Sequence, residues 1–328
     1  MKEILNRLFE HDKLSRSEAK EVLLNIGSGA YNDIQITAFT TAFNMRPLTL
    51  DELQGFRDAL LELCVKVNVD GMATLDIVGT GGDNKNTFNI STLSCIVVAG
   101  AGYKVTKHGS YGVSSAVGSS DVLIQLGYPF SNNQDDLLNQ LEKANICFLH
   151  APLFHPALKT VVPVRKQLGT KTFFNIMGPL VNPIQPTHQM FGTFSLELLR
   201  SYQYIMEQSG RKFSIIYALD GYDEISLTGD IKWVSNENEK LLKPDSFNLQ
   251  QVKNIDLHGG ETSEEAAAIF ISVLENNATE AQRNVVLANA GLAIHTIHPE
   301  KSLIDCVEEA RESIESGNAL STLKKLIS

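Results

Sequence analysis

A glycine-rich turn at residues 79–83, with the sequence GTGGD, is the first feature of this chain that could bind a ligand. Glycine lets the backbone approach a ligand closely, and residues 89–92 (NIST) are expected to begin a helix whose first N–H groups carry a partial positive charge. Together these features predict a cradle for an anion such as phosphate. Asp83 would repel a phosphate, so we expect it to contact a sugar hydroxyl or to act as a bridge. The alternative is a tight turn without a ligand, because the pattern matches neither the P-loop nor GxGxxG.

A second polar loop, rich in serine and glycine, is expected at residues 107–115 (KHGSYGVSS) and 118–121 (GSSD). Ligands in open α/β sheets bind beyond the carboxyl ends of the strands, so this loop and the glycine turn could line one pocket. Lys107 would supply a point charge, and the serines would supply short hydroxyl groups for phosphate. The alternative is an ordinary solvated loop.

Two neighbouring carboxylates, Asp223 and Glu224, follow an apolar run. Such a pair suits Mg²⁺, which keeps several waters and needs only one or two protein carboxylates plus phosphate oxygens. An exposed acidic turn is the alternative. Arg165 carries a guanidinium that suits a planar carboxylate, although a single Arg on a helix is usually a surface residue. His150 and His155 have no partner at metal-ligand spacing, so we interpret them as structural.

These parts together predict a pocket for a phosphorylated sugar that carries a diphosphate, with a magnesium site and an arginine for an acidic acceptor. No Ser/His/Asp or Cys/His arrangement is evident in the sequence, and none is needed. Cleavage of a C1–O bond to diphosphate passes through an oxocarbenium-like cation. The protein therefore mainly positions the reactants and stabilises the charge of the leaving group.

These loops must be positioned by strands and helices, which the sequence predicts as short apolar runs alternating with segments of helical periodicity. Strands are expected at residues 75–78, 103–106, 146–149 and 214–219, and helices at 91–100, 135–144 and 264–275, with a mostly helical tail at 279–327. This alternation predicts an α/β fold in which a parallel sheet is flanked by helices.

The first 65 residues differ in pattern and predict four short helices, the first at residues 2–11. Capping-box patterns start at Ser15, Asn32 and Thr49, each with Glu or Gln three residues later. One apolar stripe consists of Leu53, Phe56, Leu60 and Cys64. So small a helical unit must bury its apolar faces against the rest of the chain or a second copy.

The composition excludes several classes of protein. Of the 328 residues, 43% are hydrophobic and 20% are charged, which excludes disordered and fibrous classes and allows two domains. The formal net charge of −10 opposes binding to nucleic acid or an anionic membrane. The sequence shows no secretory signal and no apolar run of membrane-spanning length. Its four cysteines lie far apart, which supports neither a disulfide framework nor a CxxC zinc site, so we expect a soluble protein of the reducing cytoplasm.

These motifs, taken together, resemble those of the anthranilate phosphoribosyltransferase family, and the resemblance covers nearly the whole chain. It rests on the turn at 79–83, residues 89–92, 107–109 and 118–121, the stretch 165–183, and Asp223 with Glu224. The resemblance implies a small helical domain at residues 1–65, completed by part of 160–185, hinged to an α/β domain at 70–328 that binds phosphoribosyl diphosphate. It also implies a homodimer formed through the helical domain.

The resemblance further implies transfer of the 5-phosphoribosyl group from phosphoribosyl diphosphate to anthranilate in tryptophan biosynthesis, with two Mg²⁺ ions and no acid–base residue. The residues that it assigns to phosphoribosyl diphosphate are Gly79, Gly82, Asp83, Thr87, Asn89, Ser91, Thr92, Lys107 and Ser119. It assigns Ser91, Asp223 and Glu224 to the metal, and Gly79, His108, Ser110 and Arg165 to anthranilate.

The chain departs from the family pattern at position 110, where Ser replaces the usual Asn that contacts the acceptor. A hydroxyl has fewer donors and acceptors than an amide, so weaker acceptor binding or a changed acceptor is one hypothesis. Another is a non-catalytic relative that binds nucleic acid, against which the negative charge and the lack of a Lys/Arg run both argue. A pyrimidine nucleoside phosphorylase would have a longer chain and another glycine pattern. A dimeric scaffold would leave the phosphate and magnesium positions unexplained.

Overall fold

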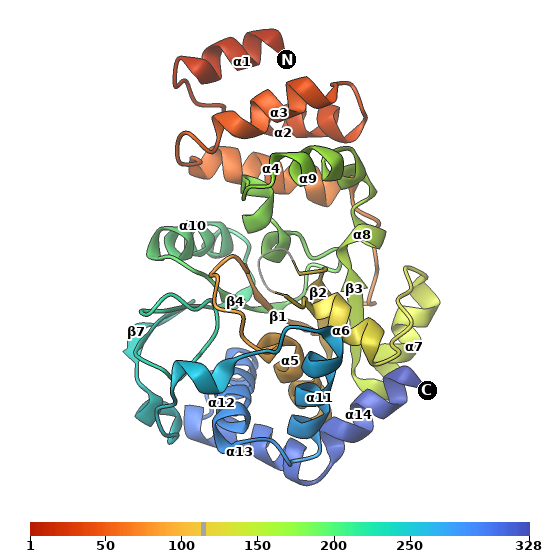
Figure 1. Ribbon diagram of the computed structural model, residues 1–328, viewed down its shortest axis with the longest axis vertical. Coiled ribbons are helices and arrows are strands. Elements are labelled where there is room, and N and C mark those ends of the chain that lie inside the picture. Colours follow the sequence, from red (N-terminus) through yellow and green to blue (C-terminus); the bar gives the residue numbers. More distant parts are fainter. Residues whose placement is uncertain (113–115) are drawn as a thin grey trace. The chain divides into compact units, whose positions relative to one another are not determined.

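The computed structural model describes residues 1–112 and 116–328, and it divides into two compact units (Figure 1). The smaller unit combines Met1–Val67 with Ala151–Gln185, and the larger unit combines Asn68–His150 with Pro186–Ser328. Residues 113–115, which belong to the expected second polar loop, lie outside the described residues. The smaller unit is helical and the larger is α/β with a mostly parallel sheet, which confirms the predicted fold class.

The first helices of the smaller unit begin where the sequence predicts. They are α1 (Lys2–Phe9), α2 (Arg16–Gly27), α3 (Asp33–Ala42) and α4 (Leu50–Leu63). The side chains of Ser15, Asn32 and Thr49 each accept a hydrogen bond from the backbone N–H three residues later, and the Glu or Gln there bonds back. The first helix ends at Phe9, two residues earlier than predicted, where His11 adopts a left-handed φ of 63°.

The helical unit buries its apolar faces against a second segment of the same chain. This segment forms α8 (Ala151–Phe154), η1 (Pro156–Thr160), α9 (Val162–Leu168), η2 (Phe173–Ile176) and η3 (Gly178–Val181). Phe173 stacks on Phe56 of α4 with ring centroids 4.5 Å apart, and Phe39 and Phe43 contact both rings edge-on. The predicted stripe on α4 is buried throughout, so residues 151–185 supply core that the first 65 residues lack.

Within the described residues of the larger unit, seven strands form one sheet in the order β3-β2-β1-β4-β5-β6-β7. The strands are β1 (Leu75–Gly79), β2 (Val105–Gly109), β3 (Ile146–His150), β4 (His188–Gly192), β5 (Lys212–Ala218), β6 (Ile231–Ser235) and β7 (Glu239–Leu242). Strands β1 to β5 are parallel, β6 is antiparallel to β5, and β7 is antiparallel to β6. The side chains of residues 75–78 are all buried, as expected for a parallel strand covered on both faces.

Helices cover this sheet (Figure 1). They are α5 (Ile90–Gly100), α6 (Ser119–Gln125), α7 (Gln134–Ala144), α10 (Leu196–Glu207), α11 (Ser263–Leu274), α12 (Glu280–Ile297), α13 (Leu303–Glu315) and α14 (Asn318–Ile327), with the short helices η4 (Pro244–Phe247) and η5 (Asn254–Leu257). Helix α5 packs against β1 and β2 and is covered by α12 and α14, while α10 packs against β5. No helix among the described residues is long and apolar enough to cross a membrane.

Three expectations about the elements need correction. Strand β4, at the centre of the sheet, was not predicted, because its sequence HQMFG begins with two polar residues and contains only two consecutive apolar residues before a glycine. Strand β2 begins at Val105 and continues to Gly109, so Lys107 and His108 lie in the strand and not in a loop. Helix α6 begins at Ser119, within the segment expected to be a loop.

Candidate active site

The three polar segments singled out in the sequence lie at one edge of the sheet. Strands β1, β2 and β5 run in the same direction, and they end at Gly79, Gly109 and Ala218. The glycine turn follows β1, the Ser/Gly loop follows β2, and the acidic turn follows β5. All three belong to the larger unit. The edge formed by these carboxyl ends is where open α/β sheets bind ligands.

The glycine turn adopts backbone conformations that favour glycine. Gly81 and Gly82 have φ angles of 64° and 83°, in the left-handed region where a Cβ atom would be strained. Asn84 follows with a φ of 61°, a conformation that Asn tolerates better than most residues. The backbone N–H of Gly81 donates a hydrogen bond of 2.6 Å to Oδ2 of Asp223. The turn is therefore held by the acidic turn that follows β5.

The carboxylate of Glu224 lies at the first turn of α5. Its Oε1 accepts a hydrogen bond of 3.0 Å from the backbone N–H of Ser91, and its Oε2 accepts one of 3.3 Å from the Thr87 hydroxyl. A helix N-terminus favours negative charge, so Glu224 occupies part of the expected anion cradle. The structure thus brings together the glycine turn, the helix start and the acidic pair.

Burial and mutual repulsion raise the pKa values of this acidic pair. For Asp223, loss of hydration is the largest cause, followed by the negative charges of Glu224 and Asp83. For Glu224, burial again dominates, and Asp83 raises the pKa further while the N–H of Ser91 and the ammonium of Lys107 lower it. The buried Asp223 and the half-buried Glu224 lie close to each other and to Asp83, an arrangement that a divalent cation would stabilise.

The acidic pair by itself is not a complete metal cage. Among residues 1–112 and 116–328, no group of three or more His, Cys, Asp or Glu side chains is arranged to hold a metal ion. Magnesium does not need such a group, because it retains waters and binds substrate phosphate oxygens beside one or two carboxylates. Asp223 and Glu224 therefore fit Mg²⁺ that arrives with a phosphorylated ligand better than they fit a resident metal.

Two glycines allow the acidic turn to reach the strand ends. Gly79 of β1 pairs in register with Gly192 of β4. A Cβ atom at Gly192 would lie 1.5 Å from the carbonyl oxygen of Asp223, and one at Gly79 would lie 2.3 Å from its Oδ2. Side chains at these two positions would therefore displace Asp223.

Lys107 and His108 are buried inside β2, where pairing with β3 extends the strand beyond its predicted end. The Lys107 ammonium donates a hydrogen bond of 2.7 Å to the carbonyl of Ile77 in β1. The backbone N–H of His108 donates to Oδ1 of Asp76 at 3.3 Å. Lys107 therefore acts on the site as a buried cation beneath the loops, close enough to Glu224 to lower its pKa.

The loop after β2 is tied to the start of α6 and to the start of α5. The carbonyl of Ser110 accepts hydrogen bonds from the Ser119 hydroxyl at 3.2 Å and from the Ser120 N–H at 3.1 Å. Asn89 donates to the carbonyl of Val117 at 3.2 Å. Ser110 and Ser119, which the family resemblance assigns to different substrates, are thus in direct contact, and Asn89 bonds to the segment just before Ser119. Thr92, in the first turn of α5, is buried.

Arg165 belongs to the smaller unit and is half-buried, not a surface residue as a single helical Arg is expected to be. It lies on α9 with its guanidinium carbon 5.9 Å from the ring centroid of Phe174, and burial lowers its pKa. Both histidines interpreted as structural make internal contacts. His150 Nδ1 lies 2.8 Å from the Ser120 hydroxyl, and His155 Nε2 donates to the carbonyl of Val181 at 3.0 Å.

Asn86 is a residue of this site that the sequence did not reveal. Its Oδ1 accepts a hydrogen bond from the N–H of Ala116 at 3.3 Å, and its Nδ2 donates to the carbonyl of Gly260 at 3.2 Å. Thr87 also forms a β-bridge with His258. Asn86 therefore braces the glycine turn against two distant segments. Only its residue type, which tolerates the observed φ of 46°, could have indicated this position.

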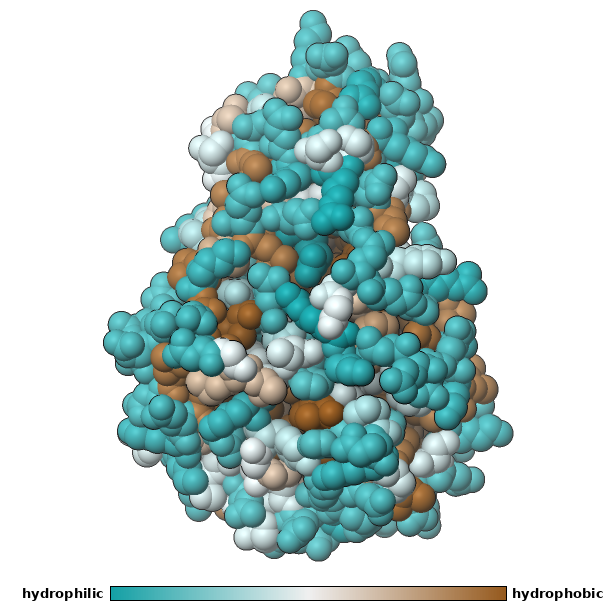
Figure 2. Space-filling model, turned by 180° about the vertical axis from the view of Figure 1, so that it is seen from behind, coloured by the Kyte–Doolittle hydropathy of each residue, from teal (hydrophilic) through white to brown (hydrophobic). Residues whose placement is uncertain are grey.

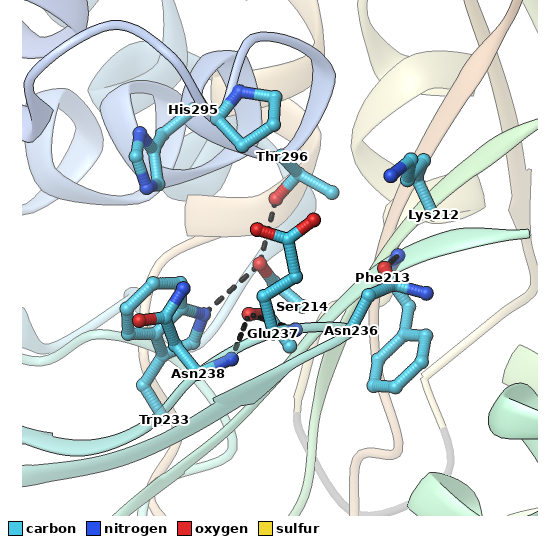
Figure 3. A pocket seen from close by; sticks show the side chains of 11 residues that line it. Lys212, Phe213, Ser214, Trp233, Asn236, Glu237, Asn238, His295 and Thr296 are labelled. Carbon is cyan, nitrogen blue, oxygen red and sulfur yellow. Dashed lines mark hydrogen bonds between the residues drawn. The ribbon is translucent and has the colours of Figure 1, made fainter.

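A small pocket with a volume of about 30 Å³ lies at the other end of β5, near Lys212 and Ser214 (Figure 3). Trp233 Nε1 donates to the Ser214 hydroxyl at 3.0 Å, and the Ser214 and Thr296 hydroxyls are 2.8 Å apart. Its buried hydroxyl groups bind one another, and it lies at the strand start, opposite to the acidic turn. It is therefore separate from the candidate site.

The helical unit, the mostly parallel sheet and the polar loops at its carboxyl edge define a two-domain glycosyltransferase. The family model "Glycosyl transferase family, helical bundle domain" matches residues 2–64, and "Glycosyl transferase family, a/b domain" matches residues 71–320. Anthranilate phosphoribosyltransferase of Cytophaga hutchinsonii is 56% identical over 327 residues, covering 100% of both chains. That of Bacteroides thetaiotaomicron is 52% identical, covering 100% of this chain and 98% of the other.

Solved structures agree with these matches. Anthranilate phosphoribosyltransferase from Thermus thermophilus superposes with a TM-score of 0.91 at 31% identity, covering 98% of each chain. The Saccharomyces cerevisiae enzyme in complex with PRPP (phosphoribosyl diphosphate) and Mg gives 0.91 at 28% identity, covering 98% of this chain and 95% of the other. The chain belongs to the anthranilate phosphoribosyltransferase family, which confirms the resemblance seen in its motifs. These matches do not favour a non-catalytic nucleic-acid-binding protein.

Proposed function

We propose that this enzyme transfers the 5-phosphoribosyl group of phosphoribosyl diphosphate to the amine of anthranilate in tryptophan biosynthesis. The C1–O bond to diphosphate breaks, a C1–N bond forms, and the amine loses a proton to solvent. The observation that carries the proposal is the junction of the glycine turn, the start of α5 and the acidic pair, joined by the Gly81–Asp223 and Ser91–Glu224 hydrogen bonds. The full-length identity to curated anthranilate phosphoribosyltransferases supports it.

The phosphoribosyl diphosphate site is the set of loops at the carboxyl ends of β1 and β2. We assign to it Gly79, Gly82, Asp83, Thr87, Asn89, Ser91, Thr92, Lys107 and Ser119. The positive end of the α5 helix dipole and the buried ammonium of Lys107 favour the negative charge of phosphate groups, and the left-handed Gly81 and Gly82 let the backbone approach them closely. Asp83, which repels phosphate, would bind a ribose hydroxyl or bridge to the metal.

Ser91, Asp223 and Glu224 would hold Mg²⁺, and we propose two ions. When bound, Mg²⁺ neutralises charge on the diphosphate leaving group. The raised pKa values of the two carboxylates follow from burial and from the repulsion that such a cation would offset. The yeast neighbour is described in complex with PRPP and Mg, which supports this assignment.

Anthranilate would contact Gly79, His108, Ser110 and Arg165. The guanidinium of Arg165 suits the acceptor carboxylate, and its half-buried position favours a charged partner. Ser110 presents a short hydroxyl from a backbone that α6 fixes through two hydrogen bonds. No residue is assigned as a general acid or base, so the chain accelerates transfer by positioning and by electrostatic stabilisation.

We also propose a cytoplasmic homodimer that forms through the helical unit. Hydrophilic side chains cover most of the face in Figure 2, with apolar patches between them. On the helical unit Phe9, Ile34 and Met45 are 61%, 80% and 76% exposed, unusually high for large apolar side chains in or near α1 and α3.

The four free, buried cysteines suit a reducing compartment. We further propose that residues 1–65, completed by part of 160–185, hinge against residues 70–328.

The proposed reaction is tested by measuring diphosphate release from phosphoribosyl diphosphate and Mg²⁺ with and without anthranilate. We expect release only when anthranilate is present, in equal amount to the anthranilate consumed. As the matched alternative, the same protein is given uridine and inorganic phosphate. Uracil formation without anthranilate-dependent diphosphate release would replace the proposed function with a nucleoside phosphorylase activity.

A further inference from the structure

One carboxylate oxygen joins both ends of the loop that follows β2. Oδ2 of Asp121 accepts a hydrogen bond of 2.9 Å from the backbone N–H of Gly112 and one of 2.8 Å from that of Gly118. Asp121 is the third residue of α6, and Gly118 caps that helix, so the second bond is an ordinary helix-start contact. The bond from Gly112 is not a helix-start contact, because Gly112 lies six residues before Gly118 in the chain.

The two ends of the loop also touch through their backbones. A Cβ atom at Gly118 would lie 2.1 Å from the nitrogen of Gly112 and 2.4 Å from the carbonyl carbon of Tyr111. Any larger residue at position 118 would force the two segments apart. Gly112, Gly118 and Asp121 therefore form a closed junction, which we name the loop neck.

The loop neck lies between residues that we assign to different substrates. Ser110, assigned to the acceptor, is two residues before Gly112, and Ser119, assigned to phosphoribosyl diphosphate, follows Gly118 directly. Both are already in contact through the hydrogen bond from the Ser119 hydroxyl to the Ser110 carbonyl. The position of one substrate contact relative to the other thus depends on the geometry of the neck.

We propose that Asp121 is a positioning residue that fixes Ser110 relative to Ser119, and so fixes the acceptor relative to the sugar diphosphate. This inference rests on the proposed function. A charged carboxylate binds backbone N–H groups more strongly than a neutral acceptor does, and two donors on one oxygen hold both ends of the loop. A displacement of about 1 Å between reactants can slow a reaction on the order of 10²-fold, so a modest opening of the neck matters.

Other contacts would hold the described residues at the two ends of the loop when Asp121 is replaced. The Tyr111 ring packs edge-on against His150 with centroids 4.8 Å apart, and His150 bonds to the hydroxyl of Ser120. Val122 and Leu123 of α6 are buried in the core. Loss of the carboxylate is therefore expected to change the spacing of Ser110 and Ser119 without unfolding α6.

The test compares three variants by steady-state kinetics, with thermal melting as a check on folding. Asp121→Ala should raise the KM for both substrates and lower kcat/KM on the order of 10²-fold. Asp121→Asn keeps an acceptor oxygen at the same place and should recover most of this loss. The matched control is Asp305→Ala, since Asp305 is the third residue of α13 and bonds only locally, to Ser302. It should leave both KM values unchanged.

The proposal would be overturned by a loss of activity in Asp121→Ala no larger than in Asp305→Ala, or by a lower melting temperature of Asp121→Ala with unchanged KM values. Gly118→Ala opens the neck without removing charge and should reproduce the KM effect, and normal constants for it would also count against the proposal. If the unaltered chain consumes no anthranilate, the proposed function fails. The role of the loop neck is then tested by calorimetric titration with phosphoribosyl diphosphate and Mg²⁺. Weaker binding by Asp121→Ala that is restored in Asp121→Asn supports the proposal, and equal binding by the variants and the unaltered chain overturns it.

Discussion

Oδ2 of Asp223 lies 2.6 Å from the backbone nitrogen of Gly81 and accepts its hydrogen bond. This contact joins the acidic turn after β5 to the glycine turn after β1, two segments separated by about 140 residues in the chain. In the proposed function the glycine turn would let the backbone approach a phosphate, and the acidic turn would supply carboxylates for a cation. Under the proposed function, substrate binding and metal binding would therefore both depend on this junction.

Removing the acidic pair should abolish most of the turnover while leaving the fold intact. For the double variant Asp223→Ala with Glu224→Ala, we expect kcat at a fixed Mg²⁺ concentration to fall on the order of 10²-fold or more, because the leaving diphosphate loses its bound cation. The control is Asp220→Ala, an exposed carboxylate of the same turn. Kinetics that stay unchanged in the double variant would show that Mg²⁺ is held elsewhere.

A methyl group at position 192 should displace Asp223 from its place. Gly192→Ala would put Cβ within 1.5 Å of the Asp223 carbonyl oxygen, so we expect a destabilisation of about 1–3 kcal/mol and reduced activity. Gly229→Ala is the matched control, because its Cβ would meet no atom closer than 3.9 Å. Urea unfolding and Mg²⁺ titration of activity measure the two effects. Equal behaviour of the two variants would refute the role given to Gly192.

Restoring an amide at position 110 should strengthen acceptor binding. Ser110→Asn adds donors and a carbonyl acceptor, and we expect the KM for anthranilate to fall roughly fivefold, as one further hydrogen bond of about 1 kcal/mol would produce. The KM for phosphoribosyl diphosphate should stay the same. A change confined to phosphoribosyl diphosphate would move Ser110 out of the acceptor site.

The buried His155 should make the helical unit sensitive to acid. Burial lowers the pKa of this ring to about 4, while a histidine in the unfolded chain has a pKa of about 6.5. Between these values the unfolded state binds more protons than the folded state. The stability contributed by the neutral ring is fully present above about pH 6.5 and is lost as the pH falls, by about 2 kcal/mol between pH 7 and pH 5.

Urea unfolding at these two pH values measures this loss. The variant His155→Gln cannot gain a charge and keeps an N–H donor for the Val181 carbonyl. We expect the wild-type free energy of unfolding to fall by about 2 kcal/mol more than that of the variant. Equal falls in the two proteins would mean that His155 is not the responsible group.

Local patterns predicted much of this fold. The capping boxes at Ser15, Asn32 and Thr49 involve only neighbouring residues, so their helix starts were correct. The glycine turn was found for the same reason. Strand β4 was missed because its sequence has no run of apolar residues. Its place at the centre of the sheet comes from pairing with β1 and β5, which are distant in the chain.

The connections within the site were beyond the reach of sequence patterns. Asn86 and Asp121 act through hydrogen bonds to backbone groups, and any residue type can supply those groups. Lys107 was expected in a loop because a charged side chain rarely lies in a buried strand. Its bond to the carbonyl of Ile77 offsets that cost, but only the pairing of β1 with β2 brings the two together.

The most direct measurement is the decrease in anthranilate fluorescence when the protein is mixed with anthranilate, phosphoribosyl diphosphate and Mg²⁺. With anthranilate in excess, we predict a loss of anthranilate that is equal in amount to the phosphoribosyl diphosphate supplied and that stops when Mg²⁺ is removed by a chelator. Persistent anthranilate fluorescence, in a sample that still binds phosphoribosyl diphosphate by calorimetry, would contradict anthranilate as the acceptor.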